Sequence, residues 1–136
     1  MGNSEVEIVA VCPDELSEVQ SFLEPYLDDR QLLKRTSLEL ELLLKHAFKA
    51  VADGRIVAFC ALEIYSKKLA EIQCLAVHSD FRRQGLGGIL VKRCVERARD
   101  EKVKELMVIS ASDEMFLTCG FDYSLPNQKR ALFIQP

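Results

Sequence analysis

Hydrophobic and polar positions follow two different periods along this chain, and each change of period predicts where one kind of element replaces another. The chain opens with a β-rich run, VEIVAV, at residues 6–11. Apolar residues then recur at helical spacing over residues 15–27, ELSEVQSFLEPYL. Asp14, directly after Pro13, is the expected N-cap of this first helix.

A second helix and a β-hairpin follow. The helix is predicted over residues 34–50, with Thr36 or Ser37 as its cap and Glu39 placed for a capping box with Thr36. The hairpin is predicted over residues 48–65, FKAVADGRIVAFCALEIY, from two β-rich runs that meet at Asp53-Gly54, a strong turn signal, and its first residues overlap the predicted helix.

The rest of the chain alternates strands and helices. The predicted elements are a strand at 69–77, an amphipathic helix at 86–102, a buried strand at 105–111, a short helix at 112–121 ended by Gly120, and a final strand at 130–135. No linker, repeat or low-complexity segment interrupts them. We therefore expect one mixed α/β domain over residues 1–136.

Composition narrows the possible partners. Hydrophobic residues make up 49% of the 136 residues and charged residues 29%, as in a domain with a real core. The net charge of −3 argues against a general nucleic-acid binder. No apolar run approaches the roughly 18 residues that suggest a membrane span. We expect no nucleic-acid partner and no membrane partner.

The cysteines favour a reduced protein. There are five of them, widely spaced and without a C-x-x-C pair, which argues against a disulfide framework and against a zinc site. We therefore expect no metal and a cytoplasmic location.

One stretch, HSDFRRQGLGGILVKRC at residues 78–94, concentrates glycines and arginines at a predicted helix start. Unpaired N–H groups and the helix dipole make such a start attractive to phosphate, and glycines allow close approach. The stretch is neither a Walker A motif nor a dinucleotide fingerprint, because Leu90 stands where the last glycine would be. By itself it remains compatible with a plain turn flanked by solvated arginines.

Its context adds a resemblance. LAVHSDFRRQGLGGILV, between a strand and a helix, resembles the acetyl-CoA motif of the GNAT N-acetyltransferase superfamily, [RQ]-x-x-G-x-[GA], with Arg82, Gly85 and Gly87 at its positions. The order of elements matches over nearly the whole chain. The resemblance implies an α/β fold with one mixed, mostly antiparallel sheet flanked by helices, and a splayed pair of parallel strands, 69–77 and 105–111, at the cofactor site.

It also implies a set of cofactor contacts. Backbone N–H groups at the helix start would hold the pyrophosphate of acetyl-CoA, and the end of the preceding strand would pair with the pantetheine arm. The residues expected to bind acetyl-CoA are Leu75, Ala76, Val77, Arg82, Arg83, Gln84, Gly85, Leu86, Gly87 and Gly88.

Acetyl transfer to an amine needs a base, and Glu71 is the best candidate. We expect it on the same strand face as Gln73 and Leu75, roughly 13 Å before Leu75 and acting through water. A solvated strand glutamate is the alternative. Many family members carry a tyrosine acid where this chain has Phe116, which leaves protonation of the thiolate to water.

Three further residues are potential catalysts but are expected to be structural. Cys119 has apolar neighbours, His78 is expected to be solvated or to cap a turn, and His46 is a base only in principle.

Several stretches, among them AEIQCLAVHSDFRRQG and LLKRT, resemble the acetyltransferase domain of N-acetylglutamate synthase. That branch implies that Lys34 and Arg35 hold a substrate carboxylate. Where it reads Thr-Thr-Arg, this chain has Ile-Ser-Ala at 109–111, so one substrate-binding arginine is missing.

The resulting prediction is an enzyme that transfers acetyl from acetyl-CoA to a primary amine of a small molecule or amino acid, by direct attack in a ternary complex. A homodimer is plausible from the resemblance. Two alternatives remain open: a protein lysine or N-terminal acetyltransferase, and a regulatory domain that binds acyl-CoA without turnover.

Overall fold

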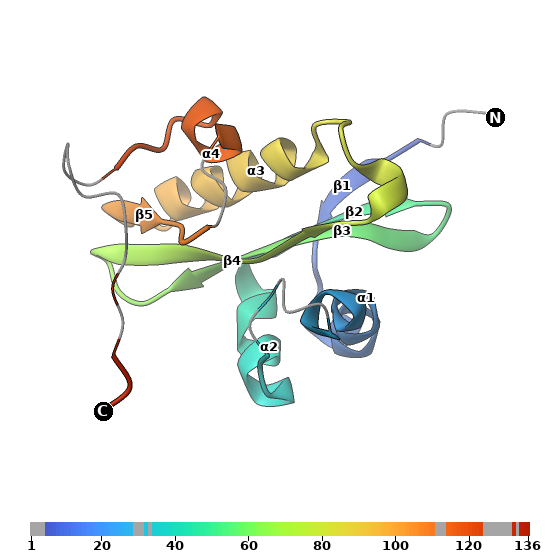
Figure 1. Cartoon of the computed structure of the whole chain (residues 1–136), viewed down its shortest axis with the longest axis horizontal. Helices are drawn as coiled ribbons and strands as arrows, with labels where there is room; N and C mark the ends of the chain where they lie inside the picture. The colour runs from blue at the N-terminus through green and yellow to red at the C-terminus, as the bar shows by residue number, and fades with distance from the viewer. Residues whose placement is uncertain (1–4, 29–31, 33, 111–113, 124–131, 133) are drawn as a thin grey trace.

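A five-stranded sheet with helices on both faces makes up the computed structural model (Figure 1). The structure describes residues 5–28, 32, 34–110, 114–123, 132 and 134–136. In chain order the elements are β1 (Glu7–Ala10), α1 (Leu16–Asp28), α2 (Ser37–Leu43), β2 (Ala47–Ala52), β3 (Arg55–Ile64), β4 (Leu69–Val77), α3 (Leu86–Asp100), β5 (Glu105–Met107) and α4 (Glu114–Thr118). Short 3-10 turns lie at Pro13–Glu15, Leu44–His46 and Ser79–Phe81.

The strands lie in the order β1-β2-β3-β4-β5. Neighbours pair antiparallel from β1 to β4, and β4 pairs parallel with β5. Helices α3 and α4 lie on one face of the sheet and α1 and α2 on the other (Figure 1). The predicted mixed, mostly antiparallel sheet flanked by helices is confirmed.

The hairpin between β2 and β3 turns at the expected dipeptide. Ala52 pairs with Arg55, so the connection is two residues long. Asp53 has φ 52° and Gly54 has φ 75°, the left-handed values that a type I′ turn requires at both central positions. This turn fixes the register of β2 against β3, the central strand of the sheet.

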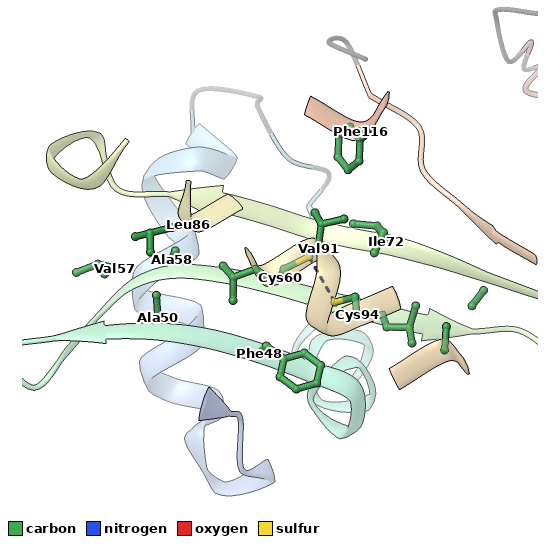
Figure 2. Packing of buried hydrophobic residues seen from close by; sticks show 14 of the residues in the cluster. Phe48, Ala50, Val57, Ala58, Cys60, Ile72, Leu86, Val91, Cys94 and Phe116 are labelled. Atoms are coloured by element: carbon green, nitrogen blue, oxygen red, sulfur yellow. Dashed lines mark hydrogen bonds between the residues drawn. The ribbon is translucent and has the colours of Figure 1, made fainter. Parts of the chain in front are cut away.

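Each face of the sheet has its own apolar cluster. On the α3 face, Val91 and Cys94 from the helix point toward Cys60 of β3 and Phe48 of β2 (Figure 2). The sulfur atoms of Cys60 and Cys94 lie 3.7 Å apart. On the other face, α1 and α2 pack on Phe59 and Ala61 of β3. The predicted stripe of the helix at 86–102 is confirmed, since Val91, Cys94 and Ala98 are buried and Val95 is half-buried.

The capping box of the second helix is also confirmed, but the predicted extent of that helix is wrong. The Thr36 hydroxyl accepts from the Glu39 N–H at 3.1 Å, and the Glu39 carboxylate accepts from the Thr36 N–H at 2.8 Å. The helix ends at Leu43 and residues 47–52 form β2. Strand β2 pairs with both β1 and β3, so these sheet hydrogen bonds outweigh the helical periodicity of the segment.

The 3-10 turn Pro13–Glu15 leads directly into α1, so the N-cap of this helical segment lies two residues earlier than predicted. Cys12, not Asp14, occupies the cap, and its N–H donates to the Glu15 carboxylate at 2.8 Å. Pro13 stands at the first position of the turn, where its fixed φ and missing N–H are favourable. This placement moves Asp14 inside the turn.

Of the three elements predicted near the C-terminus, one strand is shorter than predicted and the other lies largely outside the described residues. The strand expected at 105–111 is only three residues long, Glu105–Met107, and half-buried to exposed. The short helix is α4, and Gly120 follows it with φ 95°, as expected of a glycine beyond a helix end. The final strand expected at 130–135 falls largely outside the described residues.

Candidate active site

The start of α3 is a backbone donor site. Gly85 caps the helix with φ 79°, and Arg83 also has a left-handed φ of 64°. Ile89 is the first residue whose N–H reaches back to Gly85, at 3.1 Å, so the N–H groups of Leu86, Gly87 and Gly88 have no acceptor within the helix. A Cβ at Gly85 would meet no atom within 4 Å. The arrangement fits an anion seated on the helix start.

The charged side chains at this turn differ in their contacts. Arg82, Arg83 and Gln84 are all exposed. The Arg82 Nε donates to the Val77 carbonyl at 3.1 Å, at the end of β4. Burial raises the pKa of the Tyr26 hydroxyl, and the nearby Arg82 guanidinium opposes that rise. Arg82 therefore ties the turn to β4 and to α1, in addition to any attraction for a phosphate.

The edge of β4 that faces β5 is paired over only part of its length. The parallel pairing joins residues 69–71 to residues 105–107, while β4 continues to Val77. Within the described part of the chain, no strand pairs with this edge beyond Glu71. This divergence is the splayed parallel pair that was predicted. A Cβ at Gly87 would lie 3.9 Å from Val77 Cγ2, so the strand end and the glycine turn are adjacent.

A β-bulge interrupts β4 between Glu71, the predicted base, and residues 75–77, which were predicted to bind acetyl-CoA. Ala61 pairs with Gln73 but Phe59 pairs with Ala76, so β4 contains one extra residue, and Cys74 has a left-handed φ of 57°. As a result Cys74 joins the cluster beneath α1 and α2, while Leu75 packs with the α3 cluster. The prediction that Glu71, Gln73 and Leu75 share a face is wrong for Leu75, because the bulge reverses the alternation.

Glu71, the predicted base, is buried. It is the last residue of β4 that pairs with β5. Its Oε1 accepts a hydrogen bond from the Tyr65 hydroxyl at 2.6 Å. Burial, followed by the hydrogen bond to Glu71 and its charge, raises the pKa of Tyr65 well above its ordinary value. The alternative of a solvated strand glutamate does not fit this environment.

Sequence reasoning missed three residues that join this carboxylate. Glu63 pairs directly opposite Glu71 across β3 and β4. The Gln73 amide donates to Glu63 Oε1 at 3.0 Å and lies 3.4 Å from the Tyr65 hydroxyl oxygen. The only signal was polar residues in otherwise apolar strands, and their meeting depends on a register that the sequence does not show.

Arg35 connects to the same group of side chains. Its Nη2 donates to Gln73 Oε1, and its Nη1 lies 3.1 Å from Cys74 Sγ. The structure thus brings Arg35 and Glu71, predicted for different tasks, into one network through Gln73 and Tyr65. Lys34, in contrast, is exposed.

A cleft of about 730 Å³ opens beside Arg35 between α1 and α2. Its lining residues are Ser17, Gln20, Ser21, Leu23, Glu24, Leu27, Leu32, Lys34, Arg35, Leu40 and Cys74. The polar residues from α1 recur at helical spacing along one wall, and both predicted cations lie at the cleft. Its size suits a small organic molecule.

The remaining candidates have structural surroundings. Phe116 is buried and meets Phe121 edge-on, with ring centroids 5.6 Å apart. Cys119 is half-buried beside Met115. His78 caps a turn as expected, its Nδ1 accepting from the Asp80 N–H at 3.1 Å. Burial and the charge of Arg97 lower the pKa of His46.

Across the described residues, no helix combines the length and the apolar character needed to cross a membrane.

Relatives of the chain have been found among curated proteins. An uncharacterized N-acetyltransferase of Chlorobaculum tepidum is 30% identical over 105 residues, covering 77% of this chain and 68% of that protein. The amino-acid acetyltransferase of Photobacterium profundum is 32% identical over 126 residues, covering 88% of this chain but only 29% of the relative. The chain thus spans less than a third of the amino-acid acetyltransferase.

Solved structures share the fold. Rv2747 from Mycobacterium tuberculosis, in complex with CoA and NLQ, has a TM-score of 0.72 at 21% identity and covers 84% of this chain and 70% of its own. N-acetylglutamate synthase from Neisseria gonorrhoeae, complexed with coenzyme A and N-acetyl-glutamate, has a TM-score of 0.72 at 21% identity, covering 86% of this chain and 28% of its own. The model of the acetyltransferase (GNAT) family matches residues 13–121. The chain belongs to the GNAT family of acetyltransferases.

Proposed function

We propose that the protein transfers an acetyl group from acetyl-CoA to the primary amine of a small molecule or amino acid, by direct attack in a ternary complex. The observation that carries this proposal is the layout of β4. At one end of its splayed stretch the strand holds a buried carboxylate, Glu71, and at the other it meets the glycine turn before α3. A donor bound along that stretch would have a base at one end and phosphate-binding N–H groups at the other.

The donor side is assigned to the residues that fit it. The N–H groups from Arg83 to Gly88 would hold the pyrophosphate, with Arg82 and Arg83 adding positive charge. The edge of β4 at residues 75–77, which pairs with no strand among the described residues, would pair with the pantetheine arm. When bound, acetyl-CoA supplies a thioester-linked acetyl group that an amine attacks.

The acceptor side uses the opposite face of the sheet. An amine is mostly protonated at neutral pH and attacks only as its free base, so the chain must remove a proton. Glu71 is the group proposed to accept it, directly or through water. The cleft between α1 and α2 would bind the acceptor, and Lys34 and Arg35 would bind its carboxylate where it has one. Relatives that are amino-acid acetyltransferases support an amino-acid acceptor.

The function is tested by measuring CoA release with a panel of small amines, amino acids and lysine-containing peptides. Turnover with small amines or amino acids is the expected result. Turnover with peptides alone would indicate a protein acetyltransferase instead. Tight acetyl-CoA binding without turnover on any acceptor would indicate a regulatory domain. Two departures from the family pattern support that alternative: Phe116 in place of a tyrosine, and Ile-Ser-Ala at 109–111 in place of a stretch with an arginine.

Removing the charge of Arg35 tests the acceptor side. For an acceptor that carries a carboxylate, Arg35→Gln is expected to raise KM for the acceptor about tenfold or more, the effect of losing a charge-assisted hydrogen bond. KM for acetyl-CoA should stay nearly unchanged, because Arg35 lies on the opposite face from the glycine turn. Steady-state kinetics with each substrate varied in turn provides the measurement.

Two controls show whether the effect depends on Arg35 itself and on the carboxylate of the acceptor. Arg55→Gln removes the same charge from an exposed position at the start of β3 and should leave both KM values as they are. The carboxamide of the same acceptor should bind wild type and Arg35→Gln equally well. If the variant raises both KM values alike, or neither, Arg35 has no role in holding the acceptor.

A further inference from the structure

We propose that Tyr65 is a positioning residue for Glu71, and that Glu63 opposes it by repelling the same carboxylate. The inference rests on the proposed role of Glu71 as the base. It concerns side chains that no comparison assigns to the reaction, and it assigns a task to the three residues that sequence reasoning missed.

The geometry brings two carboxylates to one hydroxyl. Glu63 and Glu71 stand directly opposite each other in the antiparallel pairing of β3 and β4, an arrangement that is unfavourable for two negative charges. The Tyr65 hydroxyl lies 2.6 Å from Glu71 Oε1 and 3.4 Å from Glu63 Oε1. A hydroxyl has one proton to donate, and the shorter distance gives it to Glu71.

Gln73 fixes the direction of this hydrogen bond. Its Oε1 accepts from Arg35, so its Nε2 must face the other way, toward Glu63 at 3.0 Å and the Tyr65 oxygen at 3.4 Å. A tyrosine oxygen that faces a donor on one side points its own proton to the other, toward Glu71. A tyrosine hydroxyl keeps its proton at neutral pH, and burial together with Glu71 raises the pKa of Tyr65 further.

The charged and titratable groups around this pair come from several elements. Glu63 faces it from β3, Arg35 faces it through Gln73 from the segment before α2, and the Cys74 thiol lies beside Arg35. Burial raises the pKa of Cys74, so this thiol is neutral at neutral pH. Tyr65 therefore favours the charged form of Glu71, as the positive charge of Arg35 also does, and Glu63 opposes it.

Opposite signs make the proposal testable by two variants. Donation from Tyr65 favours the charged form of Glu71, so Tyr65→Phe should move the acidic limb of the kcat profile to higher pH. The charge of Glu63 disfavours that form, so Glu63→Gln should move the limb to lower pH. Tyr65→Phe should also lower kcat at neutral pH about tenfold, the effect of losing a hydrogen bond to a charged group. KM for acetyl-CoA should not change in either variant.

A second readout does not depend on activity. Absorbance titration of the tyrosines, with Tyr65→Phe used to identify the Tyr65 signal, should show a lower pKa of Tyr65 in Glu71→Gln than in wild type. The reason is that the variant removes the acceptor charge that helps to raise the pKa of Tyr65. Tyr123→Phe removes a hydroxyl from the segment after α4 and is the control, which should move neither the rate profile nor the Tyr65 signal.

The outcomes separate this inference from the proposed function. A wild type that transfers acetyl, with the acidic limb unmoved in Tyr65→Phe or moved alike in both variants, would overturn the positioning role alone. A pKa of Tyr65 that is the same in Glu71→Gln as in wild type would overturn it as well. A folded wild type without transfer to any acceptor would overturn the proposed function and, with it, a role for Tyr65 in positioning a base.

Discussion

Gly85→Glu is expected to abolish measurable acetyl-CoA binding while the protein remains folded. A side chain at this position points into open space at the start of α3, where no atom lies within 4 Å of the added Cβ. That space is the proposed pyrophosphate site, so the carboxylate would both occupy it and repel the phosphates. We expect affinity to fall about 100-fold or more, since each charge pair at about 4 Å costs one to several kcal/mol near a protein surface.

The matched control is Gly54→Glu in the hairpin turn. Gly54 has φ 75° against 79° for Gly85, and a Cβ there also meets nothing within 4 Å. The two variants therefore impose the same backbone strain, about 1 kcal/mol, and add the same charge. Calorimetry with acetyl-CoA should show normal affinity for Gly54→Glu and none for Gly85→Glu. Equal affinity in the two folded variants would refute the assignment of the cofactor site.

Glu71→Gln is expected to lower kcat by roughly 100-fold or more, the contribution typical of one general base. Glutamine keeps the shape of the side chain and an oxygen that accepts from Tyr65, but it cannot take a proton from the acceptor amine. Acetyl-CoA affinity should change little, because the glycine turn lies at the other end of the splayed strand. The acidic limb of the pH–rate profile should disappear together with the carboxylate.

The measurement is kcat for wild type and variant from pH 6 to 9, with acetyl-CoA affinity determined separately. Glu7→Gln makes the same chemical change at an exposed position on β1 and should have wild-type kinetics. Near-normal kcat for Glu71→Gln over this range would contradict the role of base. The proton would then leave through water or through another group.

Local signals predicted much of the fold. The Asp53-Gly54 turn, the capping box of Thr36 and Glu39, and the buried stripe of α3 are each confirmed, and each depends only on residues close in sequence. The splay between β4 and β5 came from a resemblance and not from local chemistry. The glycine turn was singled out from its own residues, whereas the role of Glu71 as base was predicted mainly because of the resemblance.

Features that depend on distant pairing were not predictable from the sequence. Residues 48–50 fit both the predicted helix and the first strand of the predicted hairpin, and only the pairing with β1 and β3 decides for the strand. The bulge at Cys74 puts a non-glycine residue in a left-handed conformation, which no residue preference suggests. The network of Tyr65, Gln73 and Glu63 exists because β3 and β4 adopt one register, and that register is set by the whole sheet.

The bulge in β4 has a consequence for how such an enzyme can diversify. It reverses the alternation of the strand: Glu71 and Gln73 lie on the face of α1 and α2, whereas Leu75 and Val77, also at odd positions, pack on the α3 side, and Cys74 and Ala76 lie beneath α1 and α2. Under the proposed function, neighbouring positions of one strand therefore serve different substrates: Cys74 at the bulge lines the acceptor cleft, and the edge at residues 75–77 would hold the donor. Under that proposal, a substitution on the cleft side of the strand can change the choice of amine while the donor edge stays the same. The single extra residue thus separates acceptor specificity from donor specificity, so that the acceptor can change during evolution while the donor is retained.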